Sequence, residues 1–208
     1  MRFADFDRVT ATRFFHVTVQ VGDRYAVSVR ADDNLYEYIS VTQKGSELIF
    51  GLRSSGLGIP GSYTLRSGTL EATVTLPKLA AAAARDNAQL TIPTCRVDTL
   101  AVAATANGAL HGSFEANDLR VDGDGNSFVR LSGSARSVDI TGKGNGNLDL
   151  SGLEVGSARV DLDDLSQAAI KVQDRLDYNV AGLAHLTYQG SPQIGKSSQA
   201  GSAGVTAL

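Results

Sequence analysis

The C-terminal half of the chain repeats itself at a spacing of roughly 19 residues, beginning near residue 99. Each repeat holds two short segments of alternating apolar and polar residues, separated by corners rich in Gly, Asn and Ser. Aligning the repeats produces a first apolar column of Leu100, Leu119, Val138, Ala158 and Leu176. A second column contains Val102, Val121, Ile140, Val160 and Tyr178. A third, half a repeat on, contains Leu110, Val129, Leu148, Ile170 and Leu186.

This repeat limits the folds that the chain can adopt. One coil of this length cannot bury its own inner face, whereas stacked coils share a continuous core. The pattern therefore predicts an all-β fold, a right-handed parallel β-solenoid with coils of roughly 19 residues. Glycines at the corners would allow positive φ where the chain turns: Gly108, Gly123, Gly125, Gly142, Gly144 and Gly146. A leucine-rich repeat has a similar period, but its Leu/Asn pattern is absent, and a sandwich of repeated β-hairpins is the competing interpretation.

Charged residues form outward columns in the same alignment. One column contains Ala101, Arg120, Asp139, Arg159 and Asp177, and the other contains His111, Arg130, Asp149 and Lys171. Neighbouring strands lie about 4.8 Å apart, so opposite charges would be adjacent along the stack. Each such pair contributes roughly 0.2–1 kcal/mol. The register that aligns the apolar columns also alternates the charges, which supports the solenoid.

The N-terminal residues favour antiparallel hairpins that cap the solenoid. Alternation over Phe14–Arg30 flanks a turn at Gly22-Asp23, and this predicts a first hairpin. A second is expected from strands at 36–41 and 47–52. Residues 53–68 read as a long polar loop, and a further strand, 70–76, stops at Pro77.

The boundaries follow from these patterns and define a single domain over residues 1–205. Residues 1–76 would form the hairpin cap and first strands, and residues 77–190 the stacked coils. Residues 191–208 would form a Ser/Gly-rich C-terminal tail.

Composition and charge exclude several classes of function. The 19 basic residues are scattered and the net charge is −3, so we expect no nucleic-acid partner. No apolar run is long enough for a transmembrane segment. No signal peptide is visible, so we expect a cytoplasmic chain or an exported one whose leader is missing. The single cysteine, Cys95, cannot form an intramolecular disulfide, and its apolar neighbours predict a buried thiol.

The sequence resembles the head GIN domain of auto-transporter adhesins, a bacterial family without an established function. The resemblance runs from Phe6-Asp-Arg-Val to the C-terminus, nearly the whole chain. Its most specific part is the alternating strand that begins at Leu176 and leads to Tyr188-Gln-Gly-Ser-Pro192, followed by a Ser/Gly segment. The corners depart from the family because Ser-Gly repeats are fewer here. The resemblance implies a parallel β-solenoid in the periplasm or at the cell surface, with no known enzymatic activity or functional residues.

Two glycine-rich corners are candidates for ion binding. Asp122-Gly-Asp124-Gly-Asn126 is similar to a calcium loop, but Ser127 and Gly133 stand where that loop needs Gly and a bidentate Glu. Residues 142–150 echo a calcium-binding nonapeptide without its tandem repeats. Corner chemistry is the better explanation, and we expect no cofactor, with calcium as the weaker alternative. A phosphate cradle at the same glycines is rejected because no helix follows.

No catalytic constellation is evident. His16, His111 and His185 are far apart, and no nucleophile elbow occurs. The enzymatic alternative is a polysaccharide-acting solenoid, whose acidic residues would stand on the outer face of neighbouring coils. Its candidates are Asp122, Asp161, Asp163 and Asp164. We favour a solvated acidic edge for these four.

The sequence predicts a non-enzymatic extracytoplasmic binding or scaffold module for a surface polysaccharide or an envelope protein. The face that carries Arg120, Asp139 and Arg159, together with Tyr63 in loop 53–68, is the predicted binding surface. Self-assembly is a further alternative, because a terminal coil exposes unpaired strand edges.

Overall fold

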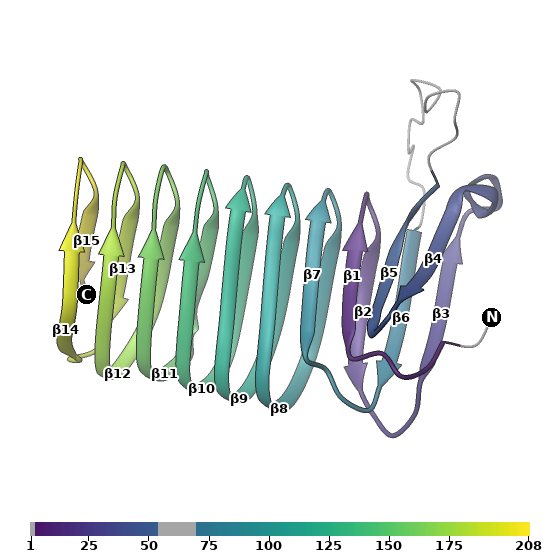
Figure 1. Cartoon of the computed structure of the whole chain (residues 1–208), viewed down its shortest axis with the longest axis horizontal. Coiled ribbons are helices and arrows are strands. Elements are labelled where there is room, and N and C mark those ends of the chain that lie inside the picture. The colour runs from purple at the N-terminus through teal and green to yellow at the C-terminus, as the bar shows by residue number, and fades with distance from the viewer. Residues whose placement is uncertain (1–2, 54–69) are drawn as a thin grey trace.

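The computed structural model describes residues 3–53 and 70–208, and Tyr63 of the predicted loop lies outside these residues. The chain forms a parallel β-solenoid of about seven turns, with coils of about 19 residues. Figure 1 shows the coils stacked side by side, with the cap at the N-terminal end and the last coil at the C-terminal end. The predicted fold class is confirmed. The strands of the coils are β1 (Arg8–Thr12), β2 (His16–Val21), β7 (Ala81–Asp86), β8 (Gln89–Ala106), β9 (Ala109–Gly125), β10 (Phe128–Gly142), β11 (Asn147–Leu162), β12 (Gln167–Val180), β13 (His185–Gln189), β14 (Gln193–Gln199) and β15 (Gly204–Ala207).

The core follows the predicted apolar columns. Leu100 lies opposite Leu119, and Leu119 opposite Val138, in parallel register. All five residues of the first column are at most 5% exposed. The third column needs one correction: Ala168, not Ile170, lies opposite Leu148. Paired residues of β11 and β12 are there separated along the sequence by one residue more than those of β10 and β11. Ile170 therefore lies opposite Leu150, the next inward residue of β11.

The corners of the solenoid stack residues in a left-handed conformation. From the coil of β7 and β8 onward, one such residue turns each coil, with φ between 59° and 74°: Asp86, Ala106, Gly125, Gly144, Asp164, Gly182 and Gly201. The predicted positive φ is thus confirmed at Gly125 and Gly144, but the other predicted corner glycines do not have it: Gly108, Gly123, Gly142 and Gly146. Beside this column, Asn126 donates to Asn107 and Asn145 donates to Asn126, both at 3.3 Å. The stacked amides tie three coils together at their tips.

The N-terminal cap differs from the predicted pair of hairpins. Strand β6 (Leu70–Leu76) lies between β2 and β3 (Ala26–Ala31), parallel to β2 and antiparallel to β3. The first predicted hairpin is therefore wrong: β2 and β3 both use β6, whose alternate residues are buried. The second hairpin is confirmed as β4 (Ile39–Lys44) with β5 (Glu47–Leu52). Its first strand starts later than predicted, because Asp33–Tyr38 form a 3-10 helix.

Aromatic side chains close the N-terminal end of the core. Phe15 and Phe50 are completely buried, with ring centroids 5.8 Å apart. Phe6 is buried beside Tyr25 at 4.9 Å. At the opposite end, residues 191–208 are not a separate tail but form another coil, in which β14 pairs with β12 and β15 with β13.

Candidate binding surface

One outward face of the solenoid carries the predicted column of charges, and we call it the charged face. It is formed by the C-terminal halves of β8 to β12. Arg120 lies opposite Asp139, and Asp139 opposite Arg159, in adjacent coils. Asp177 follows opposite Arg159 in β12. The structure thus brings together the three described residues of the predicted surface. That they bind a ligand stays a prediction.

Two ion pairs on this face join residues of one strand and not residues of adjacent coils. Arg120 donates to Asp122 through Nε at 2.8 Å and Nη2 at 3.2 Å. Arg175 holds Asp177 in the same way, at 3.0 and 2.9 Å. Residues i and i+2 point to the same face of a strand, so a guanidinium can reach its neighbour as a two-pronged donor. The carboxylate of Asp122 raises the pKa of Arg120, and that of Asp177 raises the pKa of Arg175.

Two residues of the column remain without such a partner. Arg159 and Asp139 make no hydrogen bond or ion pair within the described part of the chain. Both are exposed, and each lines a separate hollow of the charged face. A guanidinium that is not held by a neighbouring carboxylate keeps all its donors for a ligand.

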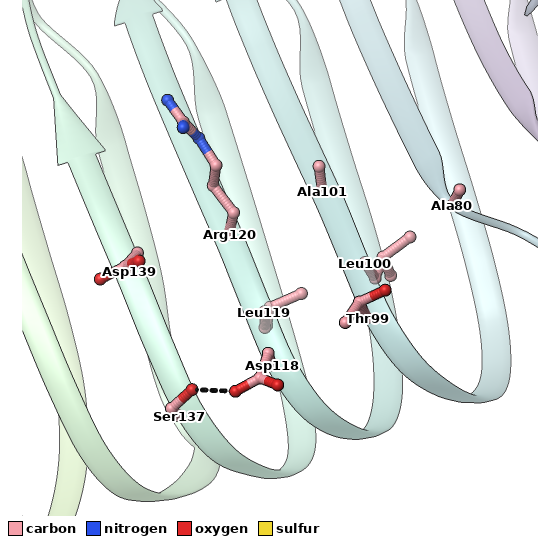
Figure 2. Close-up of a pocket in the computed structure, with 9 residues that line it drawn as sticks. All are labelled: Ala80, Thr99, Leu100, Ala101, Asp118, Leu119, Arg120, Ser137 and Asp139. Carbon is pink, nitrogen blue, oxygen red and sulfur yellow. Dashed lines mark hydrogen bonds between the residues drawn. The ribbon is translucent and has the colours of Figure 1, made fainter.

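The first hollow lies over β8, β9 and β10 and has a volume of about 410 Å³ (Figure 2). Asp118 and Arg120 line it from β9, and Asp139 lines it from β10. Asp118 accepts hydrogen bonds from Ser137 at 2.5 Å and from Arg136 at 2.9 Å. Asp118 is therefore already engaged by neighbouring groups, whereas Asp139 is not.

The second hollow lies where β11, β12 and β14 meet and has a volume of about 420 Å³. The sequence did not indicate it, because its β14 residues lie in the segment read as a tail. Its lining residues are Arg159, Val160, Asp161, Arg175, Asp177, Tyr178, Asn179, Lys196, Ser197 and Ser198.

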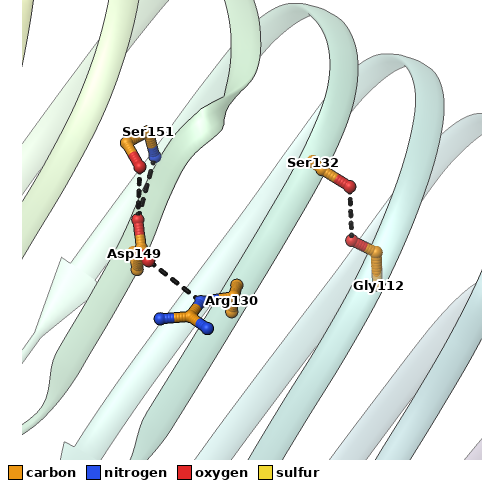
Figure 3. A network of polar contacts seen from close by, with 5 residues as sticks. All are labelled: Gly112, Arg130, Ser132, Asp149 and Ser151. Atoms are coloured by element: carbon orange, nitrogen blue, oxygen red, sulfur yellow. Dashed lines mark hydrogen bonds and ion pairs between the residues drawn. The ribbon is translucent and has the colours of Figure 1, made fainter.

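The other predicted charge column belongs to the opposite strand segment. Arg130 donates to Asp149 at 3.0 Å, which confirms that pair (Figure 3). Ser151 donates to the same carboxylate from its hydroxyl at 2.6 Å and its backbone N–H at 3.2 Å. The Ser151 hydroxyl lowers the pKa of Asp149 most, and Arg130 lowers it further. Lys171 does not extend this column as predicted: it lies opposite Glu154 and pairs with it at 2.7 Å, because β11 has a bulge before that residue.

The residues considered for calcium have local hydrogen-bond partners. Asp122 is held by Arg120. Asp124 accepts the N–H of Gly125 at 2.7 Å, and Asn126 belongs to the stacked amides. Within residues 3–53 and 70–208, no three His, Cys, Asp or Glu side chains are grouped closely enough to hold a metal ion.

Asp161, Asp163 and Asp164 of the enzymatic alternative lie together at the end of β11, and Asp122 lies two coils away from them. Thr141 lies between Asp122 and Asp161 in the register, as predicted. Asp163 accepts the N–H of Asp164 at 2.8 Å, and Asp164 accepts that of Gly144 at 3.1 Å. These two carboxylates stabilise a corner of the coil.

Cysteine and histidine add no reactive group to this surface. Cys95 is 2% exposed, as predicted, and burial raises the pKa of its thiol. His111 packs against Phe128, with ring centroids 5.5 Å apart, and His185 contacts Thr206 at 3.2 Å. His16 stands exposed at the start of β2.

None of the described helical residues forms a segment long and apolar enough to cross a membrane.

Comparison with known proteins identifies a family and a shared fold. The family profile described as "Putative auto-transporter adhesin, head GIN domain" matches residues 5–192. A putative adhesin of Bacteroides fragilis has a TM-score of 0.87 at 19% identity, covering 98% of this chain and 93% of that one. A putative lipid binding protein of Parabacteroides distasonis has a TM-score of 0.71 at 18% identity, covering 100% and 94%. A putative adhesin of Parabacteroides merdae has a TM-score of 0.70 at 15% identity, with the same coverage. No curated protein matches the chain.

Proposed function

We propose a function on the premise that this chain belongs to the head GIN domain family of auto-transporter adhesins. In this proposal the protein is a non-enzymatic binding module that works in the periplasm or at the cell surface. Its ligand is a surface polysaccharide or an envelope protein, which contacts the charged face.

The observation that carries this proposal is the regular display of polar groups across adjacent coils. Arg120, Asp139 and Arg159 repeat at the spacing of the coils along one face. Arg159 and Asp139 make no hydrogen bond or ion pair with a described residue, so ligand groups need not displace one there. A polymer lying along the solenoid axis would meet such groups at successive coils.

A binding screen against bacterial glycans and envelope proteins tests the proposal. The protein used in it is first shown by light scattering to be free of aggregates. For any ligand found, the double variant Arg120→Gln/Arg159→Gln is compared with the native chain. The loss of two charge-assisted contacts should weaken binding roughly tenfold or more. Arg96→Gln is the control, because Arg96 pairs with Glu115 on a different face. Equal binding by the double variant and the native chain would remove the charged face from the proposal.

The polysaccharide-acting enzyme is the second candidate, and the carboxylates weigh against it. Asp163 and Asp164 accept backbone N–H groups at a corner of the coil, and Asp161 accepts a hydrogen bond from Asn179. Chromatography of each bound glycan after incubation with the protein tests this candidate. Appearance of shortened products would establish it and would make Asp161 and Asp163 the first residues to substitute.

Self-assembly is favoured by one feature, the open edge of the last coil. Within the described residues β14 pairs only with β12, and β15 only with β13, which leaves one edge of each strand unpaired. Lys196 lies in the middle of β14, and a charged edge residue of this kind discourages strand addition. We therefore expect a monomer in light scattering across a range of concentrations. A mass that rises with concentration would favour assembly.

A further inference from the structure

The second hollow of the charged face is built around an irregularity in β14. Leu176 lies opposite Ile194, but Tyr178 lies opposite Ser197, so β14 carries one more residue than β12 between these positions. A bulge of this kind redirects side chains and backbone groups next to it. Here it turns the backbone N–H of Lys196 toward Asp177, whose Oδ1 accepts it at 2.6 Å.

Gly195 makes this arrangement possible. A Cβ atom at Gly195 would lie 2.0 Å from Oδ1 of Asp177 and 2.4 Å from Nη2 of Arg175. Any other residue at Gly195 would therefore displace the ion pair of Arg175 with Asp177. The pair lies against the bulge and forms the floor of the hollow together with the backbone.

The acidic groups in the hollow already have partners. Both oxygens of Asp177 accept hydrogen bonds from Arg175, and Oδ1 also accepts the Lys196 N–H. Arg175 and the Lys196 backbone lower the pKa of Asp177, so it is a carboxylate at neutral pH. Asp161 accepts a hydrogen bond from Asn179 at 2.9 Å.

The cationic groups are less occupied. The guanidinium of Arg159 and the ammonium of Lys196 make no hydrogen bond or ion pair with a described residue, and both side chains are exposed. The hydroxyls of Ser197 and Ser198 line the same hollow and can donate to a ligand. Three cationic and two acidic side chains line the hollow, which leaves a net charge of +1.

We propose that this hollow binds an oxyanion carried by a glycan, with Arg159 as the two-pronged donor and Lys196 as the second cation. Carboxylate and phosphate both suit a guanidinium fork beside an ammonium and hydroxyl donors. The inference rests on the proposed function and deepens it: the ligand is an acidic polymer, and its charged group is bound between β11 and β14.

The experiment measures binding by isothermal titration calorimetry with three polymers. Polygalacturonate supplies carboxylates, a polyglycerol phosphate supplies phosphates, and dextran is the neutral comparison. We expect binding to at least one acidic polymer, no binding to dextran, and weaker binding as ionic strength rises. The acidic polymer that binds more tightly identifies the oxyanion.

Substitutions then locate the site. Arg159→Gln and Lys196→Gln should each weaken binding roughly tenfold, and the double variant should abolish it. Gly195→Ala should also weaken binding, because it displaces the floor of the hollow. Arg96→Gln and Lys44→Gln are matched controls on other parts of the surface and should leave binding unchanged. Circular dichroism and Tm confirm that each variant is folded.

The outcomes separate this inference from the proposed function. Acidic-polymer binding that survives in the double variant, or binding of dextran alone, would overturn the oxyanion site and leave the binding module standing. If the native chain binds neither acidic polymer, the inference is wrong. The proposed function would fail only if the wider screen of glycans and envelope proteins also found no ligand.

Discussion

Ala106 is the residue at which the corner geometry makes its sharpest prediction. It turns its coil with φ of 59°, in the same stacked column as Gly125 and Gly144. A residue with a Cβ atom in the left-handed conformation costs about 1–2 kcal/mol, whereas glycine adopts it freely. Against this, glycine loses more backbone entropy on folding than alanine, by about 0.5–1 kcal/mol. Ala106→Gly should therefore stabilise the protein by about 0.5–1 kcal/mol.

The expected change is measurable by thermal unfolding. For a chain of this size about 1 kcal/mol corresponds to a Tm shift of about 2–4 °C, so Ala106→Gly should raise Tm by about 1–4 °C. The converse substitution, Gly125→Ala, should lower it, because φ is 68° and the new Cβ would lie 3.0 Å from Cα of Ala106. Urea titration gives the same comparison as a free energy of unfolding.

Ala103→Gly is the matched control for this prediction. Ala103 lies in the same strand, β8, outside the left-handed column, so glycine there has only its entropic disadvantage. We expect it to lower the free energy of unfolding by about 0.5–1 kcal/mol. If Ala106→Gly lowered Tm as much as Ala103→Gly does, strain at the corner would not be the determining factor and the reasoning would be refuted.

Three further predictions concern the core, acid stability and the thiol. Gly112→Ala should destabilise by about 1–3 kcal/mol in urea unfolding, since its Cβ would meet the Phe114 ring at 2.4 Å; an unchanged midpoint would contradict this. Asp149 has a lowered pKa, so its contribution to stability is present above the usual Asp pKa and is lost as pH falls through the lowered value. Ser151→Ala should therefore reduce stability at neutral pH but not below both pKa values, as Tm against pH will show. Cys95 should react slowly with a thiol reagent in native protein and rapidly in urea; equal rates would exclude a buried thiol.

The carboxyl-terminal coil shows where sequence patterns lose their information. Its Ser/Gly composition predicts a tail, yet β14 and β15 pair with the coil before them through backbone groups. Backbone pairing does not depend on side-chain hydrophobicity, so the hydrophobic pattern of the sequence does not predict it. The bulge at Lys196 is equally unpredictable from the sequence, because its backbone N–H binds the Asp177 carboxylate of the previous coil.

The sequence alone determined the stack and most of its register. The alternation of apolar and polar residues within a strand is a local pattern. In a solenoid, residues one repeat apart in the sequence lie next to each other in adjacent coils, so the repeat places Leu100 and Leu119 in one column. What joins distant segments was decided only by the tertiary structure. Strand β6 separates β2 from β3 across the cap, and Arg120 turns to Asp122 instead of Asp139. Both choices depend on competition between partners in three dimensions, which no local pattern records.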